Sequence, residues 1–113
     1  MIEQIVLEHL AAALEVPVGI EVSAGTDRAA QFVVLEKTSS SRADHLCTAQ
    51  FAVQSYGPTL LAAMELNEQV KAAMDGLDEL DEVVSSRLNS DYNFTDTATK
   101  RYRYQAVYDV THY

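Results

Sequence analysis

Residues 58–80 read PTLLAAMELNEQVKAAMDGLDEL, and this stretch predicts a helix packed on one face. At 100° per residue its apolar side chains fall in one sector of a helical wheel. Pro58 suits the first helical turn, where its missing N–H would be unpaired anyway, and Gly76 predicts a bent or separate last turn. The apolar sector comprises Ala62, Ala63, Leu66, Val70, Ala73, Met74, Leu77 and Leu80.

Two groups of side chains on this helix lie outside the predicted core. Leu60, Leu61 and Met64 project away from the apolar sector, so they contact either another loop of the same chain or a neighbouring subunit. The second group is a run of acidic side chains opposite the apolar sector. Such a run is usually a solvated surface, whereas a hydrolase would need one of its carboxyl groups to have a strongly raised pKa. The acidic sector comprises Glu65, Glu68, Asp75, Glu79 and Glu82.

The segment before this helix predicts a β-hairpin. Residues 31–37, QFVVLEK, are nearly all apolar, which is typical of an inner strand covered on both faces and placed in the middle of a sheet. Residues 45–56 predict a second long strand with Phe51 and Val53 on one side. Between them lie residues 38–44, TSSSRAD, whose polar and Ser-rich composition predicts an exposed connection at the tip of the hairpin.

The remaining segments complete one domain. Residues 2–14 predict an amphipathic helix ended by Pro17, and residues 18–22 predict a short strand followed by a loop over residues 23–30. Residues 81–94 predict a strand with a bulge or turn at 89–91, and residues 101–113 predict a last strand. This order indicates a single α+β domain over residues 1–113, with two helices on one face of a mainly antiparallel or mixed sheet.

Composition limits the possible partners. Eight Lys and Arg against seventeen Asp and Glu give a net charge of −9, which is unfavourable for binding phosphate backbones. The stretch KRYRYQAVY, residues 100–108, could still stack nucleotide bases, or its tyrosines could cover the sheet beneath a helix with the arginines on the opposite face. No apolar run reaches the roughly 20 residues that cross a bilayer, and we expect a cytosolic product without a signal peptide.

The sequence contains no catalytic or cofactor motif that we can identify. His9, His45 and His112 match no metal-ligand spacing, and the single cysteine, Cys47, predicts a buried and inert thiol. The four glycines are too scattered for a phosphate-binding loop or a dinucleotide fingerprint. We therefore expect no enzymatic activity, no cofactor and no metal.

Four strings, taken in order, resemble one protein family. They are FVVLEKTSSSR (residues 32–42), TAQFAVQSYG (48–57), AAMELNEQVKAAM (62–74) and the closing D-x4-RYRYQAVYDV (96–110). Together with the order of elements, they are similar to the small tail terminator, or tail-completion, proteins of long-tailed bacteriophages and related prophages. The resemblance covers residues 18–110, and none of the strings is a catalytic motif.

The resemblance implies places in the fold for several residues. A glycine common after the EKT-like triplet of the family is Ser39 in this chain. The implied positions are before the hairpin tip for Glu36, Lys37 and Thr38, before the long helix for Ser55 and Tyr56, and around the last hairpin for Asp96, Arg101 and Tyr102.

The resemblance also implies an assembly role in the virion tail, with assembly in the bacterial cytoplasm. Such proteins form a ring, typically a hexamer, at the head-proximal end of the tail tube, stop tube growth and offer a surface for the head–tail connector, while DNA passes without specific binding. The expected interface residues are Leu60, Leu61, Met64, Ser39, Ser40, Ser41 and Arg42, with docking loops at residues 24–30 and 38–43; the expected lumen-facing acids are Glu65, Glu68, Asp75 and Glu79.

Three alternatives stay open at this point. One is a small-ligand-binding or regulatory α+β domain that works as a dimer, with a pocket between helices and sheet. Another is a different head–tail joining protein, and the third is a hydrolase that uses the clustered carboxylates.

Overall fold

The long amphipathic helix is α2, Leu60–Asp75, in the computed structural model, which describes residues 1–22, 30–99 and 101–113. Its N-cap is Thr59, whose hydroxyl accepts a hydrogen bond from the Ala62 N–H at 3.1 Å, so the helix begins two residues later than Pro58 predicts. Gly76 ends α2, and the 3₁₀ helix η1, Leu77–Glu79, follows. The predicted separate last turn is therefore confirmed.

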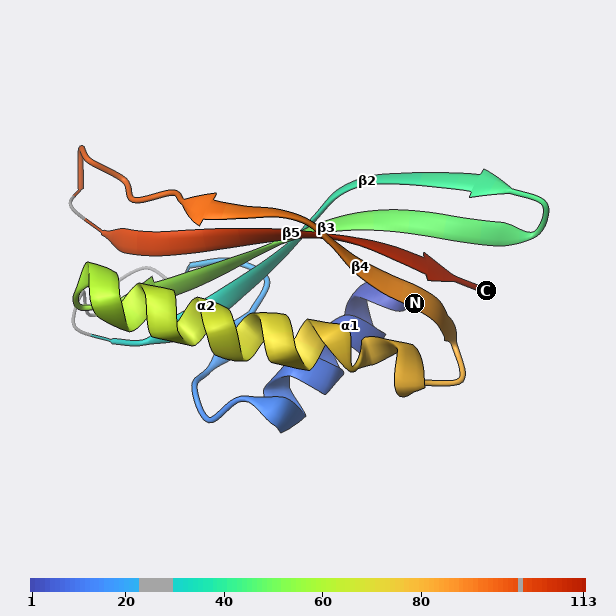
Figure 1. Ribbon diagram of the computed structural model, residues 1–113, viewed down its shortest axis with the longest axis horizontal. Helices are drawn as coiled ribbons and strands as arrows, with labels where there is room; N and C mark the ends of the chain where they lie inside the picture. Colours follow the sequence, from blue (N-terminus) through green and yellow to red (C-terminus); the bar gives the residue numbers. More distant parts are fainter. Residues whose placement is uncertain (23–29, 100) are drawn as a thin grey trace.

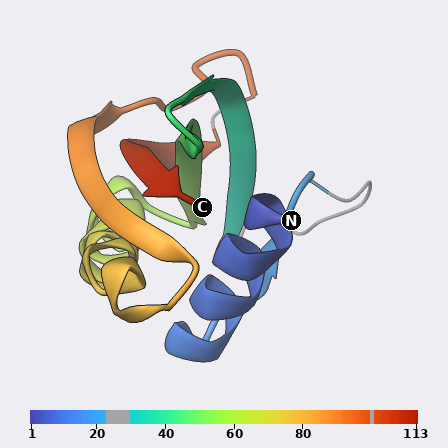
Figure 2. The ribbon, with the colours of Figure 1, turned by 90° about the vertical axis from the view of Figure 1, so that its right-hand side faces the viewer.

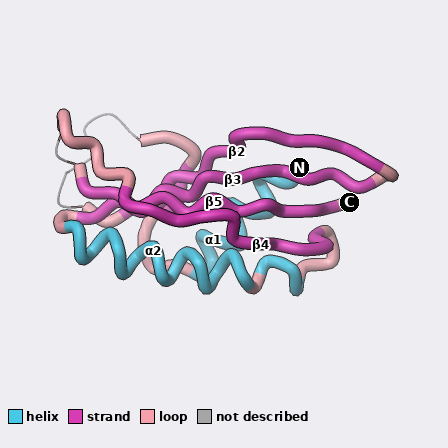
Figure 3. Tube along the Cα trace, turned by 45° about the horizontal axis from the view of Figure 1, so that its top comes forward, coloured by secondary structure: helices cyan, strands magenta, loops and turns pink. Residues whose placement is uncertain are grey.

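The sheet has five strands in the order β1-β2-β3-β5-β4. Among the strands of the described residues, the β1–β2 pair alone is parallel. Figure 1 and Figure 3 show both helices on the same side of the sheet, which confirms the predicted α+β fold. The elements besides α2 and η1 are α1 (Ile2–Ala13), β1 (Val18–Gly19), β2 (Phe32–Ala43), β3 (Leu46–Gly57), β4 (Val83–Asn93) and β5 (Tyr102–His112).

One hydrophobic core fills the space between the helices and the sheet. It takes one face of α1, one face of α2 and alternate residues of the strands. The tyrosine face of β5 is confirmed at Tyr108, which is fully buried beneath α2, while Tyr102 is exposed. The fully buried large side chains of this core include Val6, Leu10, Phe51, Val70, Met74, Leu77 and Tyr108.

The predicted hairpin forms, but its predicted connection is wrong. Residues 38–43 continue β2; Thr38 sits at a bulge, and residues 39–43 pair with β3 as far as Ala43 opposite Leu46. The turn is Asp44–His45, where both residues have positive φ angles of 51° and 67°, as a two-residue hairpin turn requires. The polar run TSSSRA reflects a strand exposed on both faces, which composition alone does not distinguish from a loop.

Two further predictions about strands need correction. The strand expected over residues 18–22 is only Val18–Gly19, and Ile20 beyond it is 67% exposed. β2 is covered on both faces at Val33, Val34 and Leu35 and is an inner strand between β1 and β3, as predicted, but the middle strand of the sheet is β3. The bulge expected near residue 89 is confirmed, because the β4 register shifts between Leu88 and Ser90.

Candidate functional site

The most prominent surface feature is an extension of the β2–β3 hairpin, which we call the arm. It comprises residues 36–43 of β2, the turn at residues 44 and 45, and residues 46–48 of β3. Every β2 residue of the arm is exposed, including the expected contact residues Ser39, Ser40, Ser41 and Arg42. Figure 1 shows the arm extending past the helices at the right-hand end of the molecule.

The arm is fixed to the body where β2 passes α1. Lys37 Nζ lies 3.0 Å from Glu3 Oε2, and this ion pair lowers the pKa of the Glu3 carboxyl. Thr38 sits at a bulge in β2 and its hydroxyl donates to the Gln50 carbonyl at 3.2 Å and the Gln50 side-chain oxygen at 3.0 Å. The arm therefore has a defined register and is anchored to α1, while its β2 side chains stay exposed.

The start of α2 presents the apolar side chains that the helical wheel places outside the core. Leu61 is 63% exposed and Met64 is 41% exposed, whereas Leu60 is half-buried. The prediction that Leu61 and Met64 lie outside the core is confirmed. Whether another subunit covers them stays a prediction.

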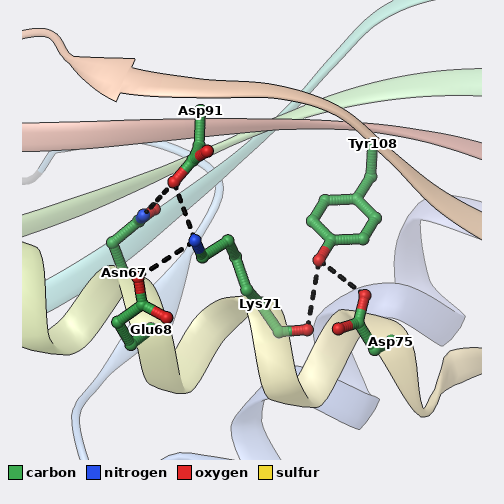
Figure 4. Close-up of polar contacts among 6 residues, drawn as sticks. All are labelled: Asn67, Glu68, Lys71, Asp75, Asp91 and Tyr108. Atoms are coloured by element: carbon green, nitrogen blue, oxygen red, sulfur yellow. Dashed lines mark hydrogen bonds and ion pairs between the residues drawn. The ribbon is translucent and has the colours of Figure 1, made fainter.

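The acidic face is exposed at Glu65, Glu68 and Asp75 of α2 and at Glu79 of η1, as expected. Two of these carboxylates also bind groups of their own chain. Glu68 Oε1 lies 3.0 Å from Lys71 Nζ, and Asp75 Oδ1 accepts a hydrogen bond from the Tyr108 hydroxyl at 2.8 Å. The acidic face is therefore partly tied to the sheet, as Figure 4 shows.

Lys71 is the cation that links α2 to β4. Its Nζ lies 2.9 Å from Asp91 Oδ2, which also accepts a hydrogen bond from the Asn67 amide at 2.9 Å (Figure 4). These contacts lower the pKa of Asp91, with the hydrogen bond from Lys71 as the largest cause. They raise the pKa of Lys71, with Asp91 contributing most and Glu68 next. The cluster clamps a partly buried helix–strand contact.

Tyr108 completes this cluster from β5. Its hydroxyl donates to Asp75 and lies 3.1 Å from the Lys71 carbonyl oxygen (Figure 4). Burial raises the pKa of Tyr108 far above its ordinary value, and the hydrogen bond to Asp75 adds to the rise. A phenol held protonated in this way acts as a structural donor rather than as a general base.

The face of the sheet away from the helices, which we call the helix-free face, carries a hydrogen-bonded row of side chains. Gln54 Nε2 donates to Gln105 Oε1 at 2.9 Å, and Gln105 Nε2 donates to the Tyr92 hydroxyl at 2.6 Å. Gln54 and Gln105 are both buried. The row crosses β3, β5 and β4, so this face has satisfied polar groups without a second layer of helices.

A cation and three aromatic rings form the next row of the helix-free face. Arg103 donates to the Tyr56 hydroxyl at 2.9 Å and to the Phe94 carbonyl at 2.6 Å, and its guanidinium lies 4.3 Å from the Phe94 ring centroid. Phe32 stacks on Tyr56 with ring centroids 4.5 Å apart. The alternation of Arg103, Gln105 and Asp109 along β5 indicates a polar face, but it does not show that neighbouring strands link their side chains.

The chain's cysteine and histidines occupy separate places. Cys47 is half-buried in the arm, which corrects the prediction of a buried thiol; it borders a hollow of about 410 Å³ between the arm and Ile2. His112 borders the same hollow, His45 lies in the hairpin turn and His9 donates to the Ala73 carbonyl at 2.8 Å. Among the described residues, no group of three His, Cys, Asp or Glu side chains is placed to hold a metal ion.

No protein-family model matches this chain, and no curated protein matches it. No helix within the described ranges is both long enough and apolar enough to cross a membrane. Of the two predicted docking loops, residues 24–29 lie outside the described residues, and the other is the arm. The structure thus places the arm on one part of the surface, and the exposed start of α2 and the acidic face together on the helix α2 and its continuation η1.

Proposed function

We propose that this protein is a tail terminator of a long-tailed bacteriophage or prophage, a structural component of the virion tail. Copies of the chain form a ring, most simply a hexamer, at the end of the tail tube. The ring stops polymerisation of the tube protein and offers a surface to the head–tail connector. The four strings that resemble this family, together with the α+β order of elements, motivate the proposal.

The observation that carries the proposal is the arm. Its β2 strand buries no side chain, and among the described residues it pairs with β3 alone, whereas β3 stays paired with β5 as far as Cys47 opposite His112. A protein that works alone has little use for such an extension. A subunit that docks on neighbours and on a tube end needs surface beyond its own core, and the arm supplies backbone and side chains for it.

Charge and apolar exposure support the same role. Leu61 and Met64 are exposed next to the acidic face of α2, which suits a contact with another subunit at the start of the helix. A net charge of −9 per subunit suits a channel for DNA, because an acidic wall repels phosphate groups. DNA then passes without being held.

The direct test combines solution mass with electron microscopy. Light scattering after size exclusion at several protein concentrations gives the oligomer, and purified tail tubes incubated with the protein show whether their ends are capped. A ring, or a monomer that caps tube ends, is the expected result. A stable dimer indifferent to tubes would overturn the proposal in favour of a regulatory dimer, and binding to the connector without capping would indicate another head–tail joining protein.

A substitution pair tests the start of α2. Met64→Glu is expected to leave the chain folded and to weaken assembly, because it places a charge in an apolar contact. Ala72→Glu, an equally charged change at an exposed position two turns along the helix, is the matched control and is expected to assemble normally. Equal assembly of both variants would remove Met64 from the interface.

A further inference from the structure

In the described residues the sheet has two open edges, one along β2 and one along β4. Within the described ranges, β2 beyond Val34 pairs with β3 alone, because β1 ends at Gly19 opposite Val34. On the other side, β5 is the single partner of β4 in the part of the chain that the structure describes. Figure 2 shows β2 and β4 at opposite edges of the sheet. Such edges expose backbone N–H and C=O groups that can pair with another strand.

The directions of the strands suit a contact between these two edges. β2 is antiparallel to β3, β3 to β5 and β5 to β4, so β2 and β4 run in opposite directions. When two copies stand side by side in the same orientation, the β2 edge of one meets the β4 edge of the next as an antiparallel pair. This is the sense in which the three long strand pairs of the sheet already associate.

Charges on the two edges are complementary on the helix-free face. Glu36 lies in register with Ala52 of β3, and Arg87 lies in register with Asp109 of β5, which puts both side chains on this face. Both residues are exposed, and neither forms an ion pair with another described residue. An exposed acid therefore lies on the β2 edge at one side of the molecule, and an exposed base lies on the β4 edge at the other.

The same register matches apolar groups on the helix side. An antiparallel pairing that sets Glu36 opposite Arg87 sets Leu35 opposite Leu88, and Leu88 is 43% exposed in the single chain. Beside Leu35 lies a hollow of about 410 Å³ whose lining includes the exposed Met1 and Ile20. The β2 bulge at Thr38 then brings Ser39 opposite Ser85, again with both on the helix-free face.

We propose that the occupant of the open β2 edge is β4 of a second copy of this chain. The contact is heterologous, because it uses two different surfaces, and its repetition closes into a ring when the rotation between copies allows it. The sheet contact stands on the edges alone, whereas its closure into a ring at a tube end rests on the proposed function. The arm thereby becomes the element that joins the sheets of neighbouring subunits.

Cysteine cross-linking tests the register. In a Cys47→Ser background, the chain carrying both Ser39→Cys and Ser85→Cys is oxidised, free and after incubation with tail tubes, and compared with each single-cysteine chain. The expected result is a ladder of covalent oligomers beyond the dimer from the double variant alone. An efficient dimer from Ser39→Cys alone would show that β2 pairs with β2 across a two-fold axis, and would overturn the proposal.

Charge exchange gives a second readout that does not depend on cysteine geometry. Arg87→Glu is expected to weaken self-association at least tenfold, and Glu36→Arg added to it is expected to restore association. Glu36→Arg combined with Arg42→Glu has the same net charge as the matched pair but leaves Arg87 opposite a second arginine. In this mismatched control self-association should be weakened. Failure of the matched pair to restore what Arg87→Glu weakens would overturn the proposed pairing.

These results separate the two proposals. A covalent ladder without capping of tube ends would keep the edge contact and reject the terminator role. Rings or capped tubes that give no ladder would keep the terminator role and reject this contact. Protein that stays monomeric, caps no tubes and gives no ladder would reject both.

Discussion

β3 passes through two different environments within one strand. From Phe51 to Gly57 it lies at the centre of the sheet and every residue is buried, with the helices on one side and the polar rows of the helix-free face on the other. From Leu46 to Thr48 it belongs to the arm and is only half-buried. The strand is continuous, so the difference comes from what packs against it.

The comparison shows that two kinds of stabilisation act along the same hairpin. In the body, burial of apolar side chains dominates, at roughly 25 cal/mol per Å² of apolar surface removed from water. In the arm, backbone pairing and exposed side-chain contacts remain, and these contribute little net free energy. Substitutions in the body should therefore change folding, while changes in the arm should change association.

The largest expected effect comes from the body. Phe51→Ala removes a fully buried ring from the core between sheet and helices and should cost about 3–5 kcal/mol in the free energy of unfolding. Leu46→Ala, on the same strand but in the arm, should cost less than about 1 kcal/mol because the side chain is only half-buried. Urea unfolding of both variants measures the contrast, and equal losses would mean that the arm shares the core.

The second effect tests how closely the end of β3 packs against the start of α2. A Cβ added at Gly57 would lie 2.9 Å from the Ala63 backbone nitrogen and 3.0 Å from the Ala62 Cβ, so the strand and the start of α2 must separate. Gly57→Ala should cost about 1–3 kcal/mol. Gly19→Ala is the control, since its nearest contact would be an ordinary 3.7 Å. Thermal melts that do not distinguish the two variants would contradict this account.

The clamp between α2 and β4 predicts a pH-dependent contribution to the stability of the body. The pKa of Asp91 is lowered in the folded chain, so its stabilisation is present above its ordinary pKa of 3.8 and is lost as the pH falls through the folded value. The raised pKa of Lys71 keeps that side chain charged at every pH below its ordinary value of 10.5. The clamp therefore weakens in acid and is constant through neutral pH.

Removing the carboxylate isolates this contribution. Asp91→Asn should cost about 1 kcal/mol at pH 7, because the pair is partly exposed to solvent. The difference from the native chain should shrink toward zero as the pH falls below about 4. The measurement is the free energy of unfolding at pH 7 and below about pH 4, for the native chain and for Asp91→Asn. Asp109→Asn, which removes a carboxylate from the helix-free face, is the comparison variant. A difference that persists in acid would assign the loss to packing instead of charge.

The predictable parts of this fold are those whose side chains sort between core and solvent. The apolar sector of α2 and the buried face of α1 predicted these two helices, because burial on one side imposes a helical period on the sequence. The β2 half of the arm escaped prediction as a strand because neither of its faces is buried, so no period marks residues such as Ser39 and Ser40. Ile20 and Val22 caused the opposite error, a strand predicted where none forms. Their alternation suggested a half-buried strand, but the structure leaves both side chains exposed.

The candidate site was only partly predictable for the same reason. Leu61, Met64 and the acids of α2 were visible because they contradict or oppose a strong helical period. Glu36, Arg87 and Leu88 were not, because their meaning depends on which strands end up at the two edges of the sheet. The order of strands is a property of the whole fold, and spacing along the chain does not encode it locally.

The smallest expected change in stability comes from shortening the arm, and it gives the sharpest separation of folding from association. Deleting Ser39, Ser40 and Ser41 moves the remaining tip residues of β2 by an odd number of positions, which exchanges the faces to which their side chains point. In the body this exchange would bury polar groups. In the arm the β2 side chains are exposed on both faces, so the loss in unfolding free energy should stay below about 0.5 kcal/mol. The same deletion removes much of the open β2 edge, so rings and capped tubes should disappear from a chain that melts almost as the native one does. A shortened chain that still assembles would move the contact to the start of α2, and a chain that unfolds would show that the arm belongs to the body.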